Sequence, residues 1–139
     1  MSDWNQQVIA EFRANEGKVG GGFAGRSMVL VHHRGRKSGK EYVIPLMYLA
    51  KEGDGDSIYI FASKGGAPVH PEWYHNLVTA GETTVEVGTD SYPVTIRELR
   101  GEERDRVYAD QVSAMPNFGE YEQKAEGIRI IPVLELTRH

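Results

Sequence analysis

A cluster of basic residues stands out in a chain that is acidic as a whole. Four of the seven residues from Arg34 to Lys40, in "RGRKSGK", are basic, whereas the 139-residue chain has a formal net charge of -4. Arginine presents a planar fork to phosphate or carboxylate oxygens, and lysine presents a point charge. Gly35 and Gly39 would let the backbone approach a ligand closely. The segment is therefore either an anion-binding loop or a solvated turn, and its local pattern leaves both interpretations open.

A second segment that could do chemistry is "ASKGGAPVHPEWYHNL". It places Ser63 and Lys64 at the end of an expected strand, before two adjacent glycines whose N–H groups could face an anion. Pro71 suits the first turn of a following helix, and a helix N-terminus also favours anions. The alternative is a plain strand–loop–helix connection in which Trp73 packs in the core.

The histidines do not form a pattern that is typical of a metal site. His70 and His75 are five residues apart, so one helix face cannot present both, as the zinc motif HExxH requires. His32 and His33 are adjacent in an expected strand and should point to opposite faces. The chain has no cysteine, which excludes disulfides, thiol nucleophiles and cysteine-ligated metals. We therefore expect no metal.

The elements that would position these segments are strands with short helices between hairpins. Trp4, Val8 and Phe12 recur every four residues and predict a helix over residues 2–14, and five glycines from Gly17 to Gly25 predict a loop after it. We expect strands at "SMVLVHH", "YVIPLMYLA", "SIYIFAS", "TTVEV", "YPVTIREL" and "IRIIPVLEL", and further helices at "PEWYHNLVTAG", "GEERDRVYADQVSAMP" and "NFGEYEQKA". Pro45 lacks a ladder donor and predicts an edge strand or a bulge. Most links between strands are too short for a parallel crossover, so the pattern predicts an α+β fold around an antiparallel barrel.

The composition narrows the class of protein. Hydrophobic residues make up 40% and charged residues 26%, as in a globular protein, and 139 residues fit a single domain. No run of about 18 apolar residues is present, and the N-terminus lacks the features of a secretory signal. The mild acidity argues against a nucleic-acid partner. We expect a cytoplasmic protein with no integral membrane segment.

The two chemical segments, with others in the same order, resemble the deazaflavin (coenzyme F420)-dependent nitroreductase family. The matching stretches are "EFRANEGKVGG", "GRKSGKEYVIPLMY", "FASKGGAPVHPEWYHNL", "GEERDRVYADQV", "PNFGEYEQKA" and "IPVLEL", which cover nearly the whole chain. Members use coenzyme F420, an 8-hydroxy-5-deazaflavin with a phosphate-bearing, polyglutamylated tail. The family fold is a split β-barrel, similar to the FMN-binding split barrels, and agrees with the antiparallel pattern.

The resemblance implies a role for each matching residue. The phosphate and acidic tail of the coenzyme would be bound by Arg36, Lys37 and Ser38, with Lys40 and Tyr42 nearby. Pro45 and Leu46 would lie along the coenzyme. The deazaflavin and its phosphate would be lined by Ala62, Ser63, Lys64 and Gly65, and the groove would be closed by Trp73, Tyr74, Asn76 and Leu77. Phe118 and Tyr121 would face the substrate, and the candidate catalytic residues are Tyr121 and Ser63.

The activity that the resemblance implies is hydride transfer from reduced F420 to an electron-poor acceptor, which is an activated alkene, a quinone or a nitro-compound. The cofactor carries this chemistry, while Tyr121 could donate a proton or hydrogen bond to the acceptor. Two alternatives stay open. One is an FMN-dependent split-barrel oxidoreductase, and the other is a non-catalytic module that binds the coenzyme or a lipid-like ligand. Beyond the small-molecule acceptor, the sheet edges of a barrel this small could pair two copies into a homodimer.

Overall fold

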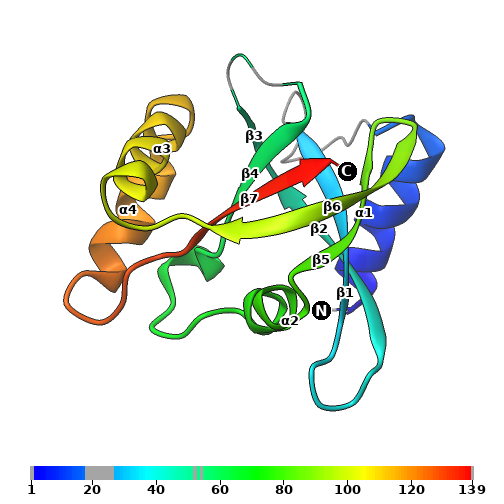
Figure 1. Cartoon of the computed structure of the whole chain (residues 1–139), viewed down its shortest axis with the longest axis horizontal. Helices are drawn as coiled ribbons and strands as arrows, with labels where there is room; N and C mark the ends of the chain where they lie inside the picture. The colour runs from blue at the N-terminus through cyan, green and yellow to red at the C-terminus, as the bar shows by residue number, and fades with distance from the viewer. Residues whose placement is uncertain (1, 18–26, 52, 54, 139) are drawn as a thin grey trace.

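The computed structural model describes residues 2–17, 27–51, 53 and 55–138, and its centre is one curled sheet (Figure 1). The strands are β1 Met28–Arg34, β2 Glu41–Met47, β3 Leu49–Ala50, β4 Ser57–Phe61, β5 Glu82–Val87, β6 Asp90–Glu98 and β7 Val133–Arg138. The helices are α1 Ser2–Ala14, α2 Glu72–Ala80, α3 Gly101–Ala114 and α4 Asn117–Ala125, with a 3-10 turn, η2, at Lys64–Gly66. The sheet has seven strands in the order β2-β1-β5-β6-β7-β4-β3, and all its pairs are antiparallel. The predicted α+β fold around an antiparallel split barrel is confirmed, with the sheet curled into a half-barrel.

The sheet curls because the two strands at the ends of its order are consecutive in the chain. β2 pairs with β1 and β3 pairs with β4, although Tyr48 alone separates β2 from β3. The backbone N–H of Tyr48 donates to the carbonyl oxygen of Ser27, 3.0 Å away. The single strand predicted at "YVIPLMYLA" is therefore two strands joined by a bend, and Pro45 lies in β2, at one end of the strand order.

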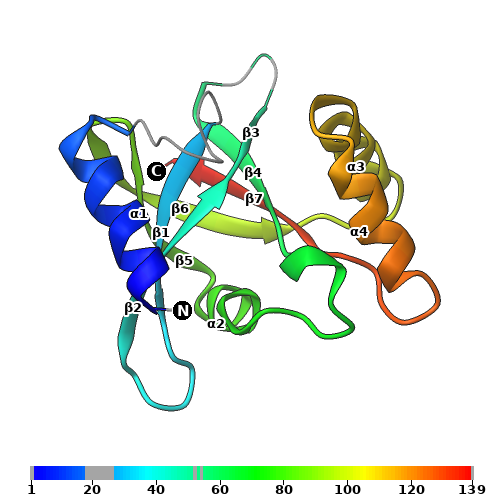
Figure 2. The same ribbon diagram turned by 180° about the vertical axis from the view of Figure 1, so that it is seen from behind.

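The first four residues of β1 and all of β4 are buried on both faces, which explains why these two strands contain continuous apolar runs. In β1, Val29 and Val31 point into the half-barrel, whereas Met28 and Leu30 point outward and pack against α1. In the same way, the outward side chains of β4 pack beneath α3 and α4. Figures 1 and 2 show α1 at one end of the molecule and α3 and α4 at the other end.

Helix α2 fills the inside of the half-barrel at one end. Trp73 and Leu77 lie one helical turn apart, and both are buried among the inward side chains of β1, β4, β5, β6 and β7. Gly81 ends the helix in the left-handed conformation, and its N–H donates to the carbonyl oxygen of Leu77. Because Trp73 and Leu77 are buried, the face of α2 that carries Glu72 and His75 is directed away from the core.

The structure differs from the sequence prediction at the last strand. β7 begins at Val133, whereas residues 128–132, which were predicted as part of the strand, form a connection in which Ile130 is 75% exposed. The predicted glycine-rich loop lies mostly outside the described residues, as does the side chain of Trp4. No described helix has both the length and the apolar character that are needed to cross a membrane.

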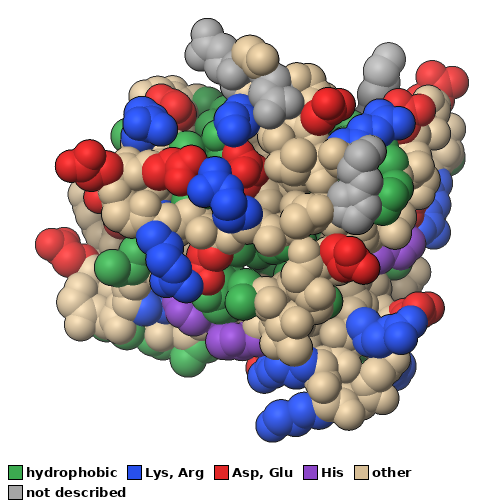
Figure 3. Space-filling view, viewed as in Figure 1, with side chains coloured by type: hydrophobic (Ala, Val, Ile, Leu, Met, Phe, Trp, Pro, Cys, Tyr) green, Lys and Arg blue, Asp and Glu red, His purple; other side chains and the backbone are tan. Residues whose placement is uncertain are grey.

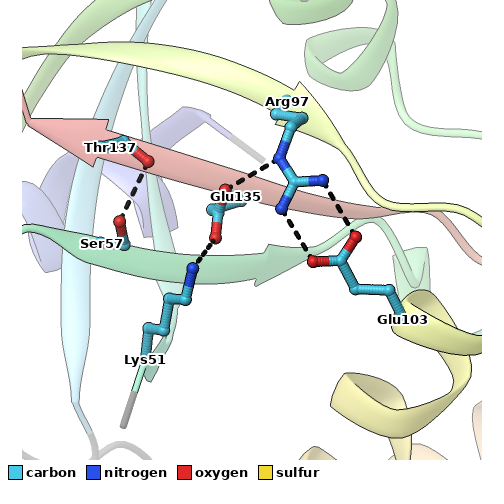
Figure 4. A network of polar contacts seen from close by, with 6 residues as sticks. All are labelled: Lys51, Ser57, Arg97, Glu103, Glu135 and Thr137. Atoms are coloured by element: carbon cyan, nitrogen blue, oxygen red, sulfur yellow. Dashed lines mark hydrogen bonds and ion pairs between the residues drawn. The ribbon is translucent and has the colours of Figure 1, made fainter. Parts of the chain in front are cut away.

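A buried carboxylate fastens the sheet to α3 (Figure 4). Glu135 of β7 is 5% exposed and accepts hydrogen bonds from Lys51 Nζ at 2.8 Å and from Arg97 Nε at 3.0 Å. The two terminal nitrogens of Arg97 donate to Glu103 of α3 at 2.9 and 2.8 Å. Since Lys51 follows β3, this network connects the short edge strand to β6, β7 and α3.

We expect the substitution Glu135→Gln to lower the free energy of unfolding by about 1 to 3 kcal/mol, because a neutral amide replaces the acceptor of two charge-assisted hydrogen bonds. Urea titration measures the loss. Glu41→Gln is the matched control, because it breaks an exposed ion pair with Arg34, for which we expect less than about 1 kcal/mol. Equal losses in the two variants would contradict the role of Glu135.

Candidate functional site

The basic loop between β1 and β2 is docked on helix α2. The side-chain oxygen of Asn76, which is buried, accepts hydrogen bonds from the backbone N–H of Arg36 at 3.1 Å and from its Nη1 at 3.2 Å. The same Nη1 donates to a carboxylate oxygen of Glu72 at 2.8 Å. The charge of Arg36 is therefore engaged in fixing the loop on the helix.

Asn76 also fixes His33. Its amide oxygen accepts from Arg36, so its Nδ2 is the atom that faces His33 Nδ1, 3.0 Å away, and that nitrogen must accept. Burial lowers the pKa of His33, and the neighbouring His32 lowers it further. The ring of His33 stacks on Tyr42, with centroids 5.2 Å apart. His33 is thus held neutral as part of the support of the loop.

The basic side chains of the site fall into two kinds. Arg34 and Arg36 form ion pairs with carboxylates. Lys37 and Lys64 are exposed, and their ammonium groups form no ion pair or hydrogen bond with the described residues. The end of the molecule that carries the β1–β2 loop shows several Lys and Arg side chains at its surface (Figure 3). The exposed lysines are the cations that can meet an anionic ligand.

A groove with a volume of about 1340 Å³ runs between α1, α2 and the β1–β2 hairpin. The predicted residues that line it are Lys40, Tyr42, Asn76 and Leu77. His32 also lines the groove, and its Nε2 lies 2.7 Å from Glu86, which Arg13 contacts through two nitrogens. The Arg13 contact holds the pKa of Glu86 below its usual range. The sequence predicted that His32 and His33 point to opposite faces, and the structure places His32 in this ion-pair cluster while His33 contacts Asn76.

The loop of residues 62–70, called the η2 segment below, lies against helix α4 through η2. Lys64 has a φ of 47°, a left-handed conformation that is uncommon outside glycine and is often found at functional sites. Gly66 has a φ of 84°, and a Cβ at this position would lie 3.0 Å from the carbonyl oxygen of Tyr121. A glycine is therefore needed for η2 to approach α4 this closely.

Tyr121 is half-buried, and its phenol oxygen accepts a hydrogen bond from Asn117 Nδ2 at 2.9 Å. Its ring packs on Phe118, with centroids 5.2 Å apart. Phe118 itself is 5% exposed and packs against Phe61 in the core, while its carbonyl oxygen accepts from Tyr108. Phe118 thus supports Tyr121 from within the core, and a direct contact of Phe118 with a substrate stays a prediction.

The remaining predicted residues form the support of the site. The buried members are Pro45, Ala62 and Trp73, and the half-buried members are Leu46, Ser63 and Tyr74. The Tyr74 hydroxyl donates to both carboxylate oxygens of Glu98, at 2.9 and 3.0 Å, and burial together with this contact raises the pKa of Tyr74 to about 12. The Ser38 hydroxyl accepts from the N–H of Lys40 and shapes the turn of the basic loop.

These contacts form a continuous belt in the order basic loop, α2, η2 segment and α4. The two segments singled out in the sequence meet through α2, although the cofactor-binding role of each residue stays a prediction. Sequence reasoning missed Arg129, which contacts the η2 segment through its guanidinium group. In the sequence, Arg129 lies between Ile128 and Ile130, as a residue in a strand would, but both isoleucines are exposed in the fold. Within the described ranges, no three His, Asp or Glu side chains are grouped as a metal site requires.

Comparisons with known proteins bear on the family and the fold of the chain. The family model for the F420H(2)-dependent quinone reductase matches residues 4–137. The F420H(2)-dependent quinone reductase Rv1261c of Mycobacterium tuberculosis is 32% identical over 131 residues, which are 93% of this chain and 86% of that protein. Among solved structures, the F420-H2 dependent reductase FDR-A is 39% identical with a TM-score of 0.68, and the match covers 80% of this chain and 94% of that chain. A structure described as a domain-swapped dimer is 35% identical with a TM-score of 0.70, over 97% and 98% of the two chains.

We expect stability to fall as the pH drops from about 7 to about 5, because His33 and His70 have lowered pKa values in the fold. Below the unfolded pKa of about 6.5, the unfolded chain binds protons more readily than the folded chain, so its free energy falls relative to the folded state. Urea titration across this pH range measures the slope. His33→Gln should reduce the slope, since glutamine can accept from Asn76 without titrating. A slope that this substitution leaves unchanged would contradict the assignment of His33.

Proposed function

The chain belongs to the F420H(2)-dependent quinone reductase family, and we propose that it reduces an electron-poor acceptor, a quinone in the first place, with reduced coenzyme F420 as the hydride donor. Dependence on F420H2 follows from the family and from the F420-H2 dependent reductase among its structural relatives. The observation that supports the cofactor site is the belt around α2, which carries exposed lysines at two places while its arginines are engaged in holding it together.

The residues present suit a cofactor with a phosphate and an acidic tail. Lys37 is exposed on the docked loop, and Lys40 lies at the groove with its ammonium group 5.8 Å from the ring centre of Tyr42. Lys64 of η2, beside Ser63, provides a third exposed cation. We propose that the tail lies along Lys37 and Lys40 and that the ring lies towards Ser63 and Tyr121. FMN, the other cofactor considered, gains no support from the relatives.

When bound, reduced F420 supplies the hydride, and the chain supplies binding, orientation and exclusion of water. Tyr121 would act on the acceptor. Its phenol oxygen already accepts from Asn117, so its own hydrogen can point to an acceptor oxygen that gains negative charge during reduction. Phe118, packed in the core against Tyr121, would keep the tyrosine ring in place.

Fluorescence titration with oxidised F420 and, separately, with FMN tests the cofactor proposal, and a panel of quinones, enones and nitroarenes tests the acceptor. We expect micromolar or tighter binding of F420 and oxidation of F420H2 by quinones. Binding of FMN alone would overturn the proposal. Binding of F420 without turnover of any acceptor would favour a module that carries the coenzyme.

Lys37→Ala should weaken F420 binding about threefold to tenfold at low salt and less at about 0.5 M salt, because mobile ions screen exposed charges. The substitution leaves the Arg36 contacts to Asn76 and Glu72 in place, so it separates charge from loop structure. Arg106→Ala removes an exposed charge from α3 and should not change the affinity. An unaltered affinity of the Lys37 variant at low salt would show that the loop is merely solvated.

Tyr121→Phe should lower kcat with a quinone by about tenfold to a hundredfold, because the acceptor loses its hydrogen-bond donor, and it should leave the dissociation constant of F420 nearly unchanged. Steady-state kinetics and the titration above measure the two quantities. Tyr92→Phe, in β6, is the control and should have wild-type kinetics. A wild-type kcat in the Tyr121 variant would assign proton delivery to another group or to water.

The relative described as a domain-swapped dimer supports one further proposal, that two copies of this chain associate. Sedimentation equilibrium of the purified protein measures the mass directly. A monomer at all concentrations would overturn this proposal and leave the cofactor site unaffected.

A further inference from the structure

Arg129 lies in the connection between α4 and β7 and contacts the η2 segment, which contains the predicted cofactor-binding residues 62–65. Its Nε donates to the carbonyl oxygen of Ala67 at 2.9 Å, and its Nη2 donates to that of Ser63 at 2.8 Å. Its Nη1 donates to the carbonyl oxygen of Ala62 at 3.1 Å and lies 2.8 Å from Nδ1 of His70. All three guanidinium nitrogens therefore contact residues 62–70.

From this geometry we propose that Arg129 is a positioning residue for cofactor binding, which holds residues 62–70 in the arrangement that receives F420. The inference rests on the proposed function. Arg129 acts through the backbone of Ser63 and its neighbours, and it does not need to contact the cofactor itself.

The planar fork of arginine is essential to this role. The acceptors are distributed around one guanidinium group, before η2 at Ala62 and Ser63 and after it at Ala67. A lysine at this position would keep the charge, but its single nitrogen cannot reach acceptors on both sides of the turn at once. Ser63 O also accepts from the N–H of Gly66, so the position of this carbonyl fixes η2 directly.

Arg129 also connects the η2 segment to helix α2. The ring of His70, which lies beside the guanidinium group, packs on Tyr74 with centroids 4.8 Å apart. Tyr74 in turn donates to Glu98 of β6. The loss of Arg129 would therefore release the η2 segment both from the α4–β7 connection and from the helix.

The charge of Arg129 adds to this effect. Among the described residues, the acceptors of Arg129 are carbonyl oxygens and an imidazole nitrogen, all of which are neutral. A half-buried positive charge that meets no carboxylate in the described part of the chain raises the electrostatic potential of the segment that it contacts. That potential favours the same class of ligand as Lys64, an anion.

Arg129→Lys and Arg129→Met test the proposal by fluorescence titration with F420. We expect both variants to bind F420 at least about tenfold more weakly, because both lose the fork. Amide hydrogen exchange, followed by NMR without cofactor, should rise at Gly66 and Ala67, whose N–H groups bond across η2. Wild-type affinity in Arg129→Lys, or unchanged exchange at these two amides, would overturn the positioning role.

Arg104 provides the matched control. It is 6% exposed, and its Nε and Nη2 donate to the carbonyl oxygen of Ile131, in the same connection as Arg129 but away from η2. Arg104→Lys should lower the Tm at least as much as Arg129→Lys and should leave the F420 affinity within about twofold, because a general loss of stability does not release the η2 segment. An equal loss of affinity in both variants would overturn the proposal.

The two proposals can fail separately. If the wild-type chain does not bind F420, the proposed function fails, and the exchange rates of Gly66 and Ala67 still decide whether Arg129 holds η2. If the wild type binds F420 and Arg129→Lys binds it equally well, the proposed function stands and the positioning role fails.

Discussion

The burial of Trp73 and Leu77 inside the half-barrel is the constraint on which the rest of the structure depends. The inward side chains of the curled sheet need an apolar cover at the open end, and one turn of α2 supplies it. Once this face is fixed, the other side chains of the helix have fixed positions too. Asn76 then meets the basic loop on one side, and Tyr74 meets His70 and Glu98 on the other.

The arginines of the site stabilise its loops, whereas its lysines are exposed and can bind an anionic ligand. Arg36 holds the basic loop through one nitrogen, Nη1, which donates to a carboxylate and an amide, and Arg129 holds residues 62–70 through a fork of three nitrogens, which donate to backbone carbonyls. Lys37 and Lys64, in the same two loops, are exposed to solvent. This division suits each side chain, because the planar guanidinium matches several fixed acceptors, while the flexible ammonium adapts to a mobile anionic tail.

The sequence predicted what depends on local pattern. Helix α1 has the predicted bounds, and the short links between strands predicted the antiparallel barrel. The sequence could not predict contacts between distant segments, such as that of Arg36 with Glu72, or the burial of Phe118. The residues around Arg129 resembled a strand because Ile128 precedes the arginine in the sequence and Ile130 and Ile131 follow it. In the fold, the arginine contacts the η2 segment, and the strand begins only at Val133.

The most direct test of the central claim, that the belt around α2 binds F420, is amide chemical-shift perturbation in a titration of the chain with oxidised F420. The account predicts saturable shifts at residues 36–40 and 63–66 and around Tyr121. The network at Glu135 should show none, because it lies on the β7–α3 side of the sheet. Shifts that concentrate near Glu135 or at the β5–β6 turn, with none in the two loops, would contradict it.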